Sequence, residues 1–340
     1  MSTTRPRPWL LPLNPLYRLA LALREFRLRR GIEPVRQLKL PVVSIGNLST
    51  GGSGKTPLTI ALAKLLTAKG LQVDILSRGY GRRSQLASRV DPQGTAEEFG
   101  DEPLLIARET GLPVYVAPQR HDAGIRAEAE TQQTGREDQL QIIHLLDDGF
   151  QHRQLARDID ILLLDRRDWH DRLLPAGNLR EPLKAAHRAS IVAIPADEPE
   201  LETELRNFGW HGPVWRLRRR MEVPAINGPV AAFCGISRPE QFFTGLEAND
   251  LILAARTAFS DHHCYIVSDI NRVANSASAS GAVAVVTTEK DLVRLGKLTS
   301  AFPESLPLLT ARLTVEIESH DTAIDWLLGS LFATPAHPRL

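Results

Sequence analysis

The sequence predicts an α/β protein with a parallel sheet flanked by helices, followed by a second, smaller α/β domain. Short apolar runs, rich in β-branched residues, alternate with polar or helical stretches at 71–76, 113–117, 159–164 and 190–194. This is the pattern of a parallel sheet covered on both faces. A glycine-rich segment also separates one apolar run from a helical pattern. A basic amphipathic helix is predicted ahead of the sheet.

The composition is that of a folded globular protein. Of the 340 residues, 43% are hydrophobic and 24% are charged, which excludes a disordered chain, a collagen and a disulfide scaffold. Cys234 and Cys264 form no CxxC pair, so we expect a reducing compartment and no structural zinc. The net charge of +1 conceals a basic segment at 1–39, with nine Lys or Arg and two Glu. Nucleic acid binding is not expected, because no aromatic residues interleave with the basic ones.

Residues 1–38 are expected to form a basic amphipathic segment at a membrane surface. Asn14-Pro15 and Gly31 delimit a helix at about 15–30, since proline favours the first helical position and glycine the position past the end. Arginines crowd its last turn, as suits an anionic interface, and its apolar face consists of Leu16, Leu19, Leu23 and Phe26. Charges and prolines interrupt it too often for a transmembrane span or a signal peptide. The alternative is a helix that packs on its own protein.

The strongest chemical signal is a phosphate-binding loop between a strand and a helix. An apolar run that begins after Lys39 leads into the loop, whose candidate phosphate-binding residues are Ser49, Thr50, Gly51, Gly52, Ser53, Gly54, Lys55 and Thr56. Glycines let successive N–H groups surround phosphate oxygens, while Lys55 can reach the β- and γ-phosphates and Thr56 can offer its hydroxyl to Mg²⁺. Ser49 departs from the common pattern, which has glycine there. The flanking strand and helix nevertheless disfavour a chance Gly-Lys-Thr in a surface loop.

A pair of carboxylates supports a nucleotide site. The apolar run 140–146 ends in Asp147 and Asp148, followed by Gly149. In nucleotide-binding sheets an aspartate at this position holds Mg²⁺ directly or through water. The alternative is a simple Asp-Asp-Gly turn, but two adjacent acids also require a nearby cation.

The phosphate loop and the carboxylate pair belong to a kinase-like domain predicted over 39–218. The stretch 216–220 is interpreted as basic and irregular, and strands at 229–233 and 282–287 beyond it bracket helices. A smaller C-terminal α/β domain is therefore predicted over 219–330.

Three weaker signals have simple interpretations. Thr288-Glu-Lys290-Asp291 resembles the guanine-reading motif of GTPases only loosely, because no residue separates Lys290 from Asp291. His262, His263 and Cys264 lack further metal ligands at suitable spacing, which favours an acid–base or packing role for the histidines. His144, within an apolar run, is interpreted as a core histidine.

Taken together, the motifs resemble the tetraacyldisaccharide 4′-kinase family, the lipid A 4′-kinases of Gram-negative bacteria. Gly-Asp-Glu-Pro, Asp-Asp-Gly-Phe-Gln-His and Leu-Arg-Glu-Pro segments distinguish this family from other nucleotide-binding proteins, and Ser49 agrees with its pattern. The matching segments run along nearly the whole chain: 46–57, 76–82, 100–103, 147–152, 174–182, 235–236, 261–263 and 288–291.

The resemblance implies an ATP- and Mg²⁺-dependent kinase that phosphorylates the 4′-hydroxyl of a tetraacyldisaccharide 1-phosphate. It also implies a peripheral enzyme at the cytoplasmic face of the bacterial inner membrane, whose partners are the glycolipid substrate and the membrane surface. The basic helix then gives access to an acceptor that does not leave the bilayer easily.

The resemblance further implies roles for individual residues. Asp101 matches the family's proposed base, assisted by a histidine of the second domain, either His262 or His263. Arg180 suits bidentate phosphate contact; the remaining candidates at the substrate or behind it are Arg78, Glu102 and His152. Because base and histidine come from different domains, we expect domain closure to assemble the site.

Two other functions compete with this hypothesis. One is a different membrane-associated P-loop kinase or GTPase, and the other is an ATP-gated surface-binding or partitioning protein. A partitioning ATPase has no need for a base that acts on a sugar hydroxyl, so Asp101 and the two histidines separate the alternatives.

Overall fold

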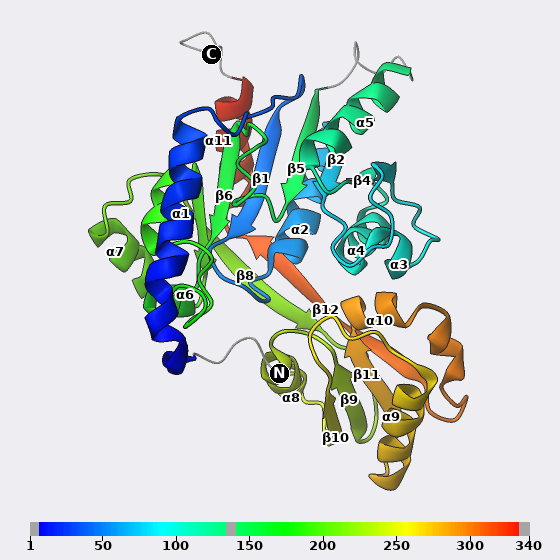
Figure 1. The fold of residues 1–340 in the computed structure, drawn as a ribbon. Helices are drawn as coiled ribbons and strands as arrows, with labels where there is room; N and C mark the ends of the chain where they lie inside the picture. Colours follow the sequence, from blue (N-terminus) through cyan, green and yellow to red (C-terminus); the bar gives the residue numbers. More distant parts are fainter. Residues whose placement is uncertain (1–6, 134–140, 333–340) are drawn as a thin grey trace.

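The computed structural model describes residues 7–133 and 141–332, and over these residues twelve strands form one continuous sheet (Figure 1). Its strand order is β10-β9-β11-β12-β8-β7-β6-β1-β5-β2-β4-β3. Pairing is parallel from β4 through to β8, so the predicted parallel sheet is confirmed. The strands are β1 (Val42–Asn47), β2 (Gln72–Ser77), β3 (Ser88–Arg89), β4 (Val114–Val116), β5 (Ile142–Asp147), β6 (Ile159–Leu163), β7 (Ile191–Pro195), β8 (Val214–Glu222), β9 (Val230–Cys234), β10 (Leu253–Ala258), β11 (Ala284–Thr288) and β12 (Leu308–Ile317).

Helices cover both faces of the larger lobe, which is built on β1 to β7. Helices α2, α4 and α11 bury one face together with residues such as Ile45 and Ile161. On the other face, α7 and η2 pack on Leu162 and Ile194, and α5 packs on Leu146. The helices are η1 (Pro8–Leu13), α1 (Asn14–Arg29), α2 (Lys55–Ala68), α3 (Ala96–Phe99), α4 (Asp101–Thr110), α5 (Arg120–Gln133), α6 (Arg166–His170), η2 (Leu183–Arg188), α7 (Glu200–Asn207), α8 (Pro239–Glu247), α9 (Val267–Ala279), α10 (Glu289–Leu295), η3 (Gly296–Ala301) and α11 (His320–Phe332).

The smaller lobe is built on β9, β10 and β11 and carries α8, α9 and α10. Its strands are parallel to one another. Alternate side chains of β9 point to opposite faces, so that Phe233 packs with the α9 side and Cys234 with the α8 side. The lobe therefore has its own apolar cores.

The two lobes are joined by β8 and β12, which run antiparallel from one lobe into the other (Figure 1). The sequence-based interpretation of 216–220 as irregular is therefore wrong. Buried Leu217 lies between exposed Arg216 and Arg218, the alternation of a strand with one solvated face. Arg218 forms an ion pair of 2.7 Å with Glu318 beside the neighbouring strand. The many arginines of 216–220 hid the alternating pattern of this strand in the sequence.

The predicted boundary at 218/219 falls inside β8. The chain also returns to the larger lobe at its end, because Ile324 and Leu327 of α11 share a core cluster with Leu62 and Leu66 of α2. The range 219–330 thus contains the smaller lobe together with one helix that packs on the larger lobe. The division into two domains stays a prediction.

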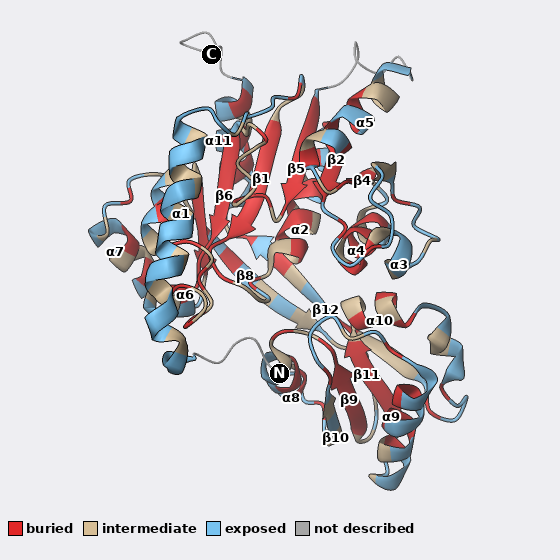
Figure 2. Cartoon of the chain, viewed as in Figure 1, coloured by how far each residue is buried: buried red, intermediate tan, exposed pale blue. Residues whose placement is uncertain are grey.

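Helix α1 lies across the larger lobe with one face partly buried and the other exposed (Figure 2). Tyr17 and Leu21 pack on the core of that lobe. The predicted apolar face remains exposed, with 64% of Leu16, 57% of Leu19 and 55% of Leu23 accessible. Within the described residues, no helix combines the length and apolarity required to cross a membrane.

Candidate active site at the lobe junction

The phosphate loop lies at the carboxyl end of β1 and leads into α2. Gly51 and Gly54 adopt φ values of 94° and 90°, a left-handed conformation that glycine adopts at little cost. Gly46 passes so close to Phe150 that a β-carbon would lie 2.5 Å from the Phe150 side chain. The backbone itself therefore explains these three glycines.

Lys55 opens α2, and oxygen atoms from two segments surround its ammonium group. Its Nζ donates to Asn47 Oδ1 at 2.9 Å and lies 3.5 Å from Asp148 Oδ1. The carboxamide of Asn47 also donates to the Ser49 hydroxyl at 3.2 Å. The end of β1 thus holds both the lysine and the first residue of the predicted loop.

Asp147 is the last residue of β5 and is almost completely buried. It lies opposite Ile45 in the parallel pairing of β5 with β1, so its carboxylate reaches the phosphate loop. Thr59 donates to its Oδ1 at 3.2 Å, while its Oδ2 has no hydrogen-bond partner. Burial, together with the charges of Glu102 and Asp148, raises the pKa of Asp147 to about 7.

Asp148 has a positive φ of 48° and forms a two-bond ion pair with Arg180. Arg180 donates from Nη1 to Oδ2 at 3.2 Å and from Nη2 to Oδ1 at 3.0 Å. Although burial alone would raise it, the pKa of Asp148 is held well below its usual range by Lys55 and Arg180. Tyr17 of α1 donates its hydroxyl proton to the Arg180 carbonyl at 2.8 Å.

Asp101 begins α4 in the larger lobe and meets His262 from the smaller lobe. Asp101 Oδ2 lies 3.1 Å from His262 Nδ1 and accepts an N–H bond of 2.7 Å from Nε of Arg294. Burial raises the pKa of Asp101, but the His262 hydrogen bond and the Arg294 charge outweigh it and hold the pKa far below normal. The same hydrogen bond raises the pKa of His262 above its model-compound value of 6.5.

His263 points into its own lobe. Its Nε2 lies 2.9 Å from Asp269 Oδ2, and its ring stacks on Phe259 with centroids 4.7 Å apart. The structure therefore brings Asp101 together with His262 and not with His263.

Three other predicted residues surround this centre. Glu102 forms an ion pair with Lys290 of the smaller lobe, which makes a second contact between the lobes. His152 lies in the loop after Asp147 and Asp148, the acidic pair. Burial and the charges of Arg120 and Arg157 lower the pKa of His152 to about 3. His152 is therefore a neutral imidazole. Arg78 lies exposed just beyond β2.

The smaller lobe also contacts the phosphate loop directly. The Gly52 N–H donates to the Ser237 hydroxyl at 2.7 Å, and Arg219 Nη2 donates to the Ser53 carbonyl at 2.7 Å. Within the larger lobe, the Thr50 N–H donates to the Asn178 carbonyl at 2.8 Å. Two of the predicted phosphate donors are therefore paired with protein oxygens in this structure.

The donor set fits a divalent cation shared with a bound phosphate. Asp147 presents a buried, unpartnered carboxylate oxygen next to Lys55, and Thr56 places a buried hydroxyl at the start of α2. No group of three or more His, Cys, Asp or Glu side chains suited to a metal ion occurs in the described part of the chain. Protein side chains alone thus offer a partial coordination shell there, as expected for Mg²⁺ bound mainly through phosphate.

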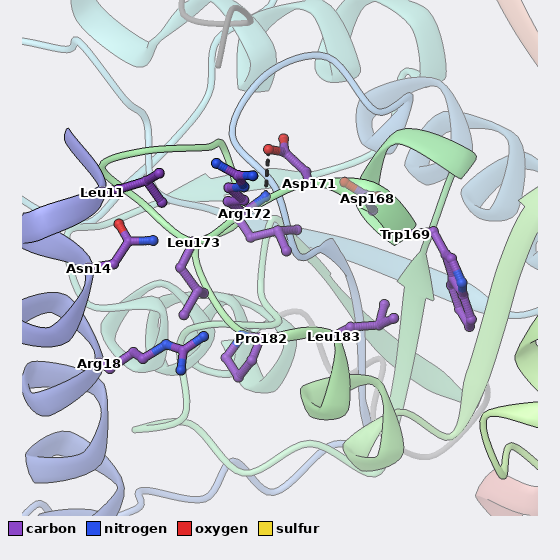
Figure 3. Close-up of a pocket in the computed structure, with 11 residues that line it drawn as sticks. Leu11, Asn14, Arg18, Asp168, Trp169, Asp171, Arg172, Leu173, Pro182 and Leu183 are labelled. Carbon is purple, nitrogen blue, oxygen red and sulfur yellow. Dashed lines mark hydrogen bonds between the residues drawn. The ribbon is translucent and has the colours of Figure 1, made fainter. Parts of the chain in front are cut away.

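A cavity of about 370 Å³ lies beside this centre, between the N-terminal helices and the 168–183 segment (Figure 3). Leu11, Leu173 and Leu183 give it apolar walls, and Arg18 adds a positive charge. Its lining includes Leu179, the residue before Arg180. The cavity therefore adjoins both α1 and the segment that carries Arg180.

Sequence reasoning missed Arg294 and Ser237. Arg294 follows Lys290 by four residues, so both lie on one face of α10 and turn toward the Asp101–Glu102 pair. This spacing was a usable signal. No sequence signal marked Ser237, because its contact with Gly52 joins residues of two different lobes.

Comparisons with known proteins agree on one family. The model of the family described as tetraacyldisaccharide-1-P 4′-kinase matches residues 6–331. A tetraacyldisaccharide 4′-kinase of Koribacter versatilis is 41% identical over 93% of this chain and 97% of its own length. The Chromobacterium violaceum protein of the same name is 36% identical over 96% of each chain. Among solved structures, Aquifex aeolicus LpxK in complex with ATP superposes with a TM-score of 0.71 at 30% identity, covering 95% of this chain and 98% of that one.

Proposed function

We propose that this chain, which belongs to the tetraacyldisaccharide-1-P 4′-kinase family, transfers the γ-phosphate of ATP to the 4′-hydroxyl of a tetraacyldisaccharide 1-phosphate. The product is the 4′-phosphorylated lipid IVA of lipid A biosynthesis. The observation that carries this function is the 3.1 Å contact between Asp101 and His262, because it pairs the expected base with a histidine. Glu102, the next residue, lies close enough to Asp147 for its charge to raise the pKa of that carboxyl. An ATPase that only hydrolyses nucleotide needs no such base for a sugar hydroxyl.

On the donor side, positive groups stabilise the charge of the transferring phosphoryl group. Lys55 Nζ is held by Asn47 and Asp148 at the start of α2, and it would turn from them to the γ-phosphate when ATP binds. Arg180 pairs with Asp148 through both terminal nitrogens, but its Nε has no hydrogen-bond partner and could donate to a phosphate oxygen. An incoming phosphate oxygen replaces Ser237 as acceptor of the Gly52 N–H. Thr56 and Asp147, with Asp148 close by, would hold Mg²⁺, which would neutralise negative charge on the phosphates.

On the acceptor side, Asp101 orients and deprotonates the hydroxyl. The bond from the acceptor oxygen to the γ-phosphorus forms as the bond from the γ-phosphorus to the ADP oxygen breaks. The hydroxyl proton passes to Asp101, which alone is a weak base for a sugar hydroxyl. Neutral His262, in the tautomer whose hydrogen is on Nε2, accepts that proton at Nδ1 late in the step. Arg294 fixes the carboxylate but, always charged, takes no proton.

The acceptor reaches the site from a membrane surface to which α1 attaches. The exposed leucines of α1 suit the headgroup boundary, and the arginines of its last turn, Arg27 and Arg29, suit anionic lipid. The contact from Tyr17 to Arg180 ties this helix to the acidic pair. We therefore place the enzyme at the cytoplasmic face of the bacterial inner membrane, as a peripheral protein.

Closure of the two lobes assembles the site, since Asp101 and His262 come from different lobes. Spin labels at exposed Arg83 and Lys297, in a Cys264→Ser background, report on the distance between the lobes. We expect that distance to change when an ATP analogue and acceptor are added. An unchanged distance would refute closure.

The function is tested with γ-labelled ATP and purified tetraacyldisaccharide 1-phosphate in detergent micelles. We expect label in a bisphosphorylated lipid with the wild-type protein and none with Lys55→Ala. Circular dichroism establishes that the variant is folded. Hydrolysis of ATP without labelled lipid would show that the acceptor is another molecule.

A further inference from the structure

Helix α10 of the smaller lobe begins within a motif, Thr288-Glu-Lys290-Asp291, that has no role in the chemistry described so far. The Thr288 hydroxyl accepts the Asp291 N–H at 3.1 Å and so caps the helix. Lys290, in the first turn, forms its ion pair with Glu102 of α4. The motif therefore sets a cation of the smaller lobe against the residue that follows Asp101.

Two sets of contacts hold α10 between the base and the phosphate loop. Buried Asp291 accepts the Gly235 N–H at 3.0 Å, and Ser237, two residues further, contacts the phosphate loop. On the other side, Arg294 bonds to both Asp291 and Asp101. The helix is thus fixed to a segment that touches the loop and to the carboxylate that serves as base.

The charge of Lys290 acts on both ends of the path along which the phosphoryl group moves. Burial raises the pKa of Asp101 and of Asp147, whereas the charge of Lys290 lowers the pKa of both. Since Coulomb attraction falls with distance, the ammonium lies near both carboxylates. Asp101 marks the acceptor hydroxyl and Asp147 the side of Mg²⁺ and the phosphates. An in-line transfer carries the γ-phosphoryl group between these positions.

The ammonium of Lys290 is charged and has donors to spare. Burial lowers its pKa, but the charges of Glu102 and Asp101 outweigh burial and raise the pKa above its ordinary value. An ammonium carries three N–H donors, and within 7–133 and 141–332 its hydrogen-bond partner is Glu102. Arg294, by contrast, spends its Nε and both terminal nitrogens on protein oxygens. Lys290 is therefore the better placed of the two to bind a phosphate oxygen.

We propose that Lys290 is a catalytic residue supplied by the smaller lobe, whose ammonium donates to an oxygen of the transferring γ-phosphoryl group. This inference rests on the proposed function, since it takes ATP to be the phosphate donor. Lys290 keeps its proton while the acceptor oxygen bonds to the γ-phosphorus and the bond to the ADP oxygen breaks. Its charge stabilises the negative charge on the phosphoryl oxygens, as an arginine supplied by a partner protein does in GTPases. Transfer is thereby coupled to contact between the lobes.

The test separates a contact with the γ-phosphate from a contact between lobes. Lys290→Met keeps the length of the side chain and removes its charge. Calorimetry compares AMP-PNP with ADP, each with Mg²⁺, because only AMP-PNP carries a γ-phosphate. We expect AMP-PNP to bind at least about tenfold more weakly, a change of about 1.4 kcal/mol, and ADP to stay within about twofold. The kcat for lipid phosphorylation should fall about 10²–10³-fold, as when one donor to developing charge is removed.

Arg312→Met is the matched control. Arg312 of β12 joins α4 to α10 as Lys290 does, through ion pairs of 3.0 Å with Glu109 and with Glu289, but it lies at the other end of α4, away from Asp101. This variant should change neither nucleotide affinity. Equal weakening of AMP-PNP and ADP by Lys290→Met would overturn the proposal, because the ammonium would then serve only to hold the lobes together.

A second background tests whether the effect passes through Glu102. Lys290→Met should weaken AMP-PNP by the same factor in a Glu102→Gln protein; if the loss disappears there, the unpaired carboxylate caused it and the proposal is wrong. Unchanged AMP-PNP affinity would also overturn it, whatever happens to kcat. Should Lys290→Met fail to fold, Lys290→Gln takes its place with the same expected discrimination. Calorimetry uses no lipid, so a failure of lipid phosphorylation in the wild-type protein would refute the proposed function and leave this result interpretable.

Discussion

The two adjacent histidines should separate activity from stability. His262 contacts Asp101 across the lobes, whereas His263 contacts Asp269 and stacks on Phe259 within one lobe. We compare His262→Gln with His263→Gln. Glutamine retains a polar side chain in both variants but cannot accept and release a proton. The two variants therefore make the same substitution at neighbouring positions whose surroundings differ.

The expected magnitudes follow from these contacts. A positioned acid–base group contributes about 10²–10⁴-fold to a rate, so His262→Gln should lower kcat about 10²–10³-fold, given that Asp101 keeps Arg294. His263→Gln loses a hydrogen bond to a carboxylate, about 1.5–3 kcal/mol, and a ring stack, about 0.5–1.5 kcal/mol. Asp269 keeps two other donors, the Ile266 N–H and Arg272. The loss of unfolding free energy should therefore be about 2–3 kcal/mol, with kcat within about twofold.

Lipid phosphorylation at saturating ATP gives kcat, and urea unfolding gives the free energy of unfolding. The interpretation is refuted if His263→Gln abolishes activity while it remains folded, or if His262→Gln keeps wild-type activity. Equal losses of stability in both variants, with equal kcat, would also contradict the assignment.

Four further outcomes follow from the same geometry. Arg180→Lys should lower kcat about 10–100-fold with little change in ATP affinity, because lysine cannot make a two-bond contact; a KM effect alone, in steady-state kinetics, would contradict this role. The Asp101 hydrogen bond raises the pKa of His262 above 6.5. Because proton transfer to His262 needs the neutral imidazole, kcat/KM should rise as the pH increases through a value above 6.5. The His262→Gln variant should lack this rise. The raised pKa also means that the contact stabilises the fold fully below pH 6.5 and less as pH rises through the raised value, a trend that urea titrations at several pH values can check. Leu19→Ser with Leu23→Ser should weaken flotation with anionic liposomes about a hundredfold or more, at about 1.5–3 kcal/mol per exposed leucine that inserts, while activity on micellar acceptor falls less; unchanged flotation would show that α1 is not the anchor.

The features predictable from sequence are those encoded in contiguous residues. The strand that ends at Asn47, the glycines and Lys55 lie within one short segment, so their pattern sufficed to place the loop. The same holds for β5 and its terminal Asp147. The local end signals Asn14-Pro15 and Gly31 also gave α1 to within about one residue at each end.

Features that depend on distant pairing were not predictable. β8 is rich in arginine and is stabilised by β12, almost a hundred residues later. The choice between His262 and His263 depends on Asp101, which lies in the other lobe. For α1, the structure shows a face that packs on the protein through Leu21 and a face on which Leu19 is exposed. Attachment of the exposed face to a membrane stays a prediction.

The position of the transferred phosphate tests the central claim most directly. Two-dimensional ¹H–³¹P correlation of the lipid product identifies the carbon that bears the new phosphate. We expect a correlation to the proton on C4′ of the distal glucosamine in the wild-type product, and no such product with Lys55→Ala. A phosphate on any other hydroxyl, or inorganic phosphate as the sole product of ATP, would contradict the claim.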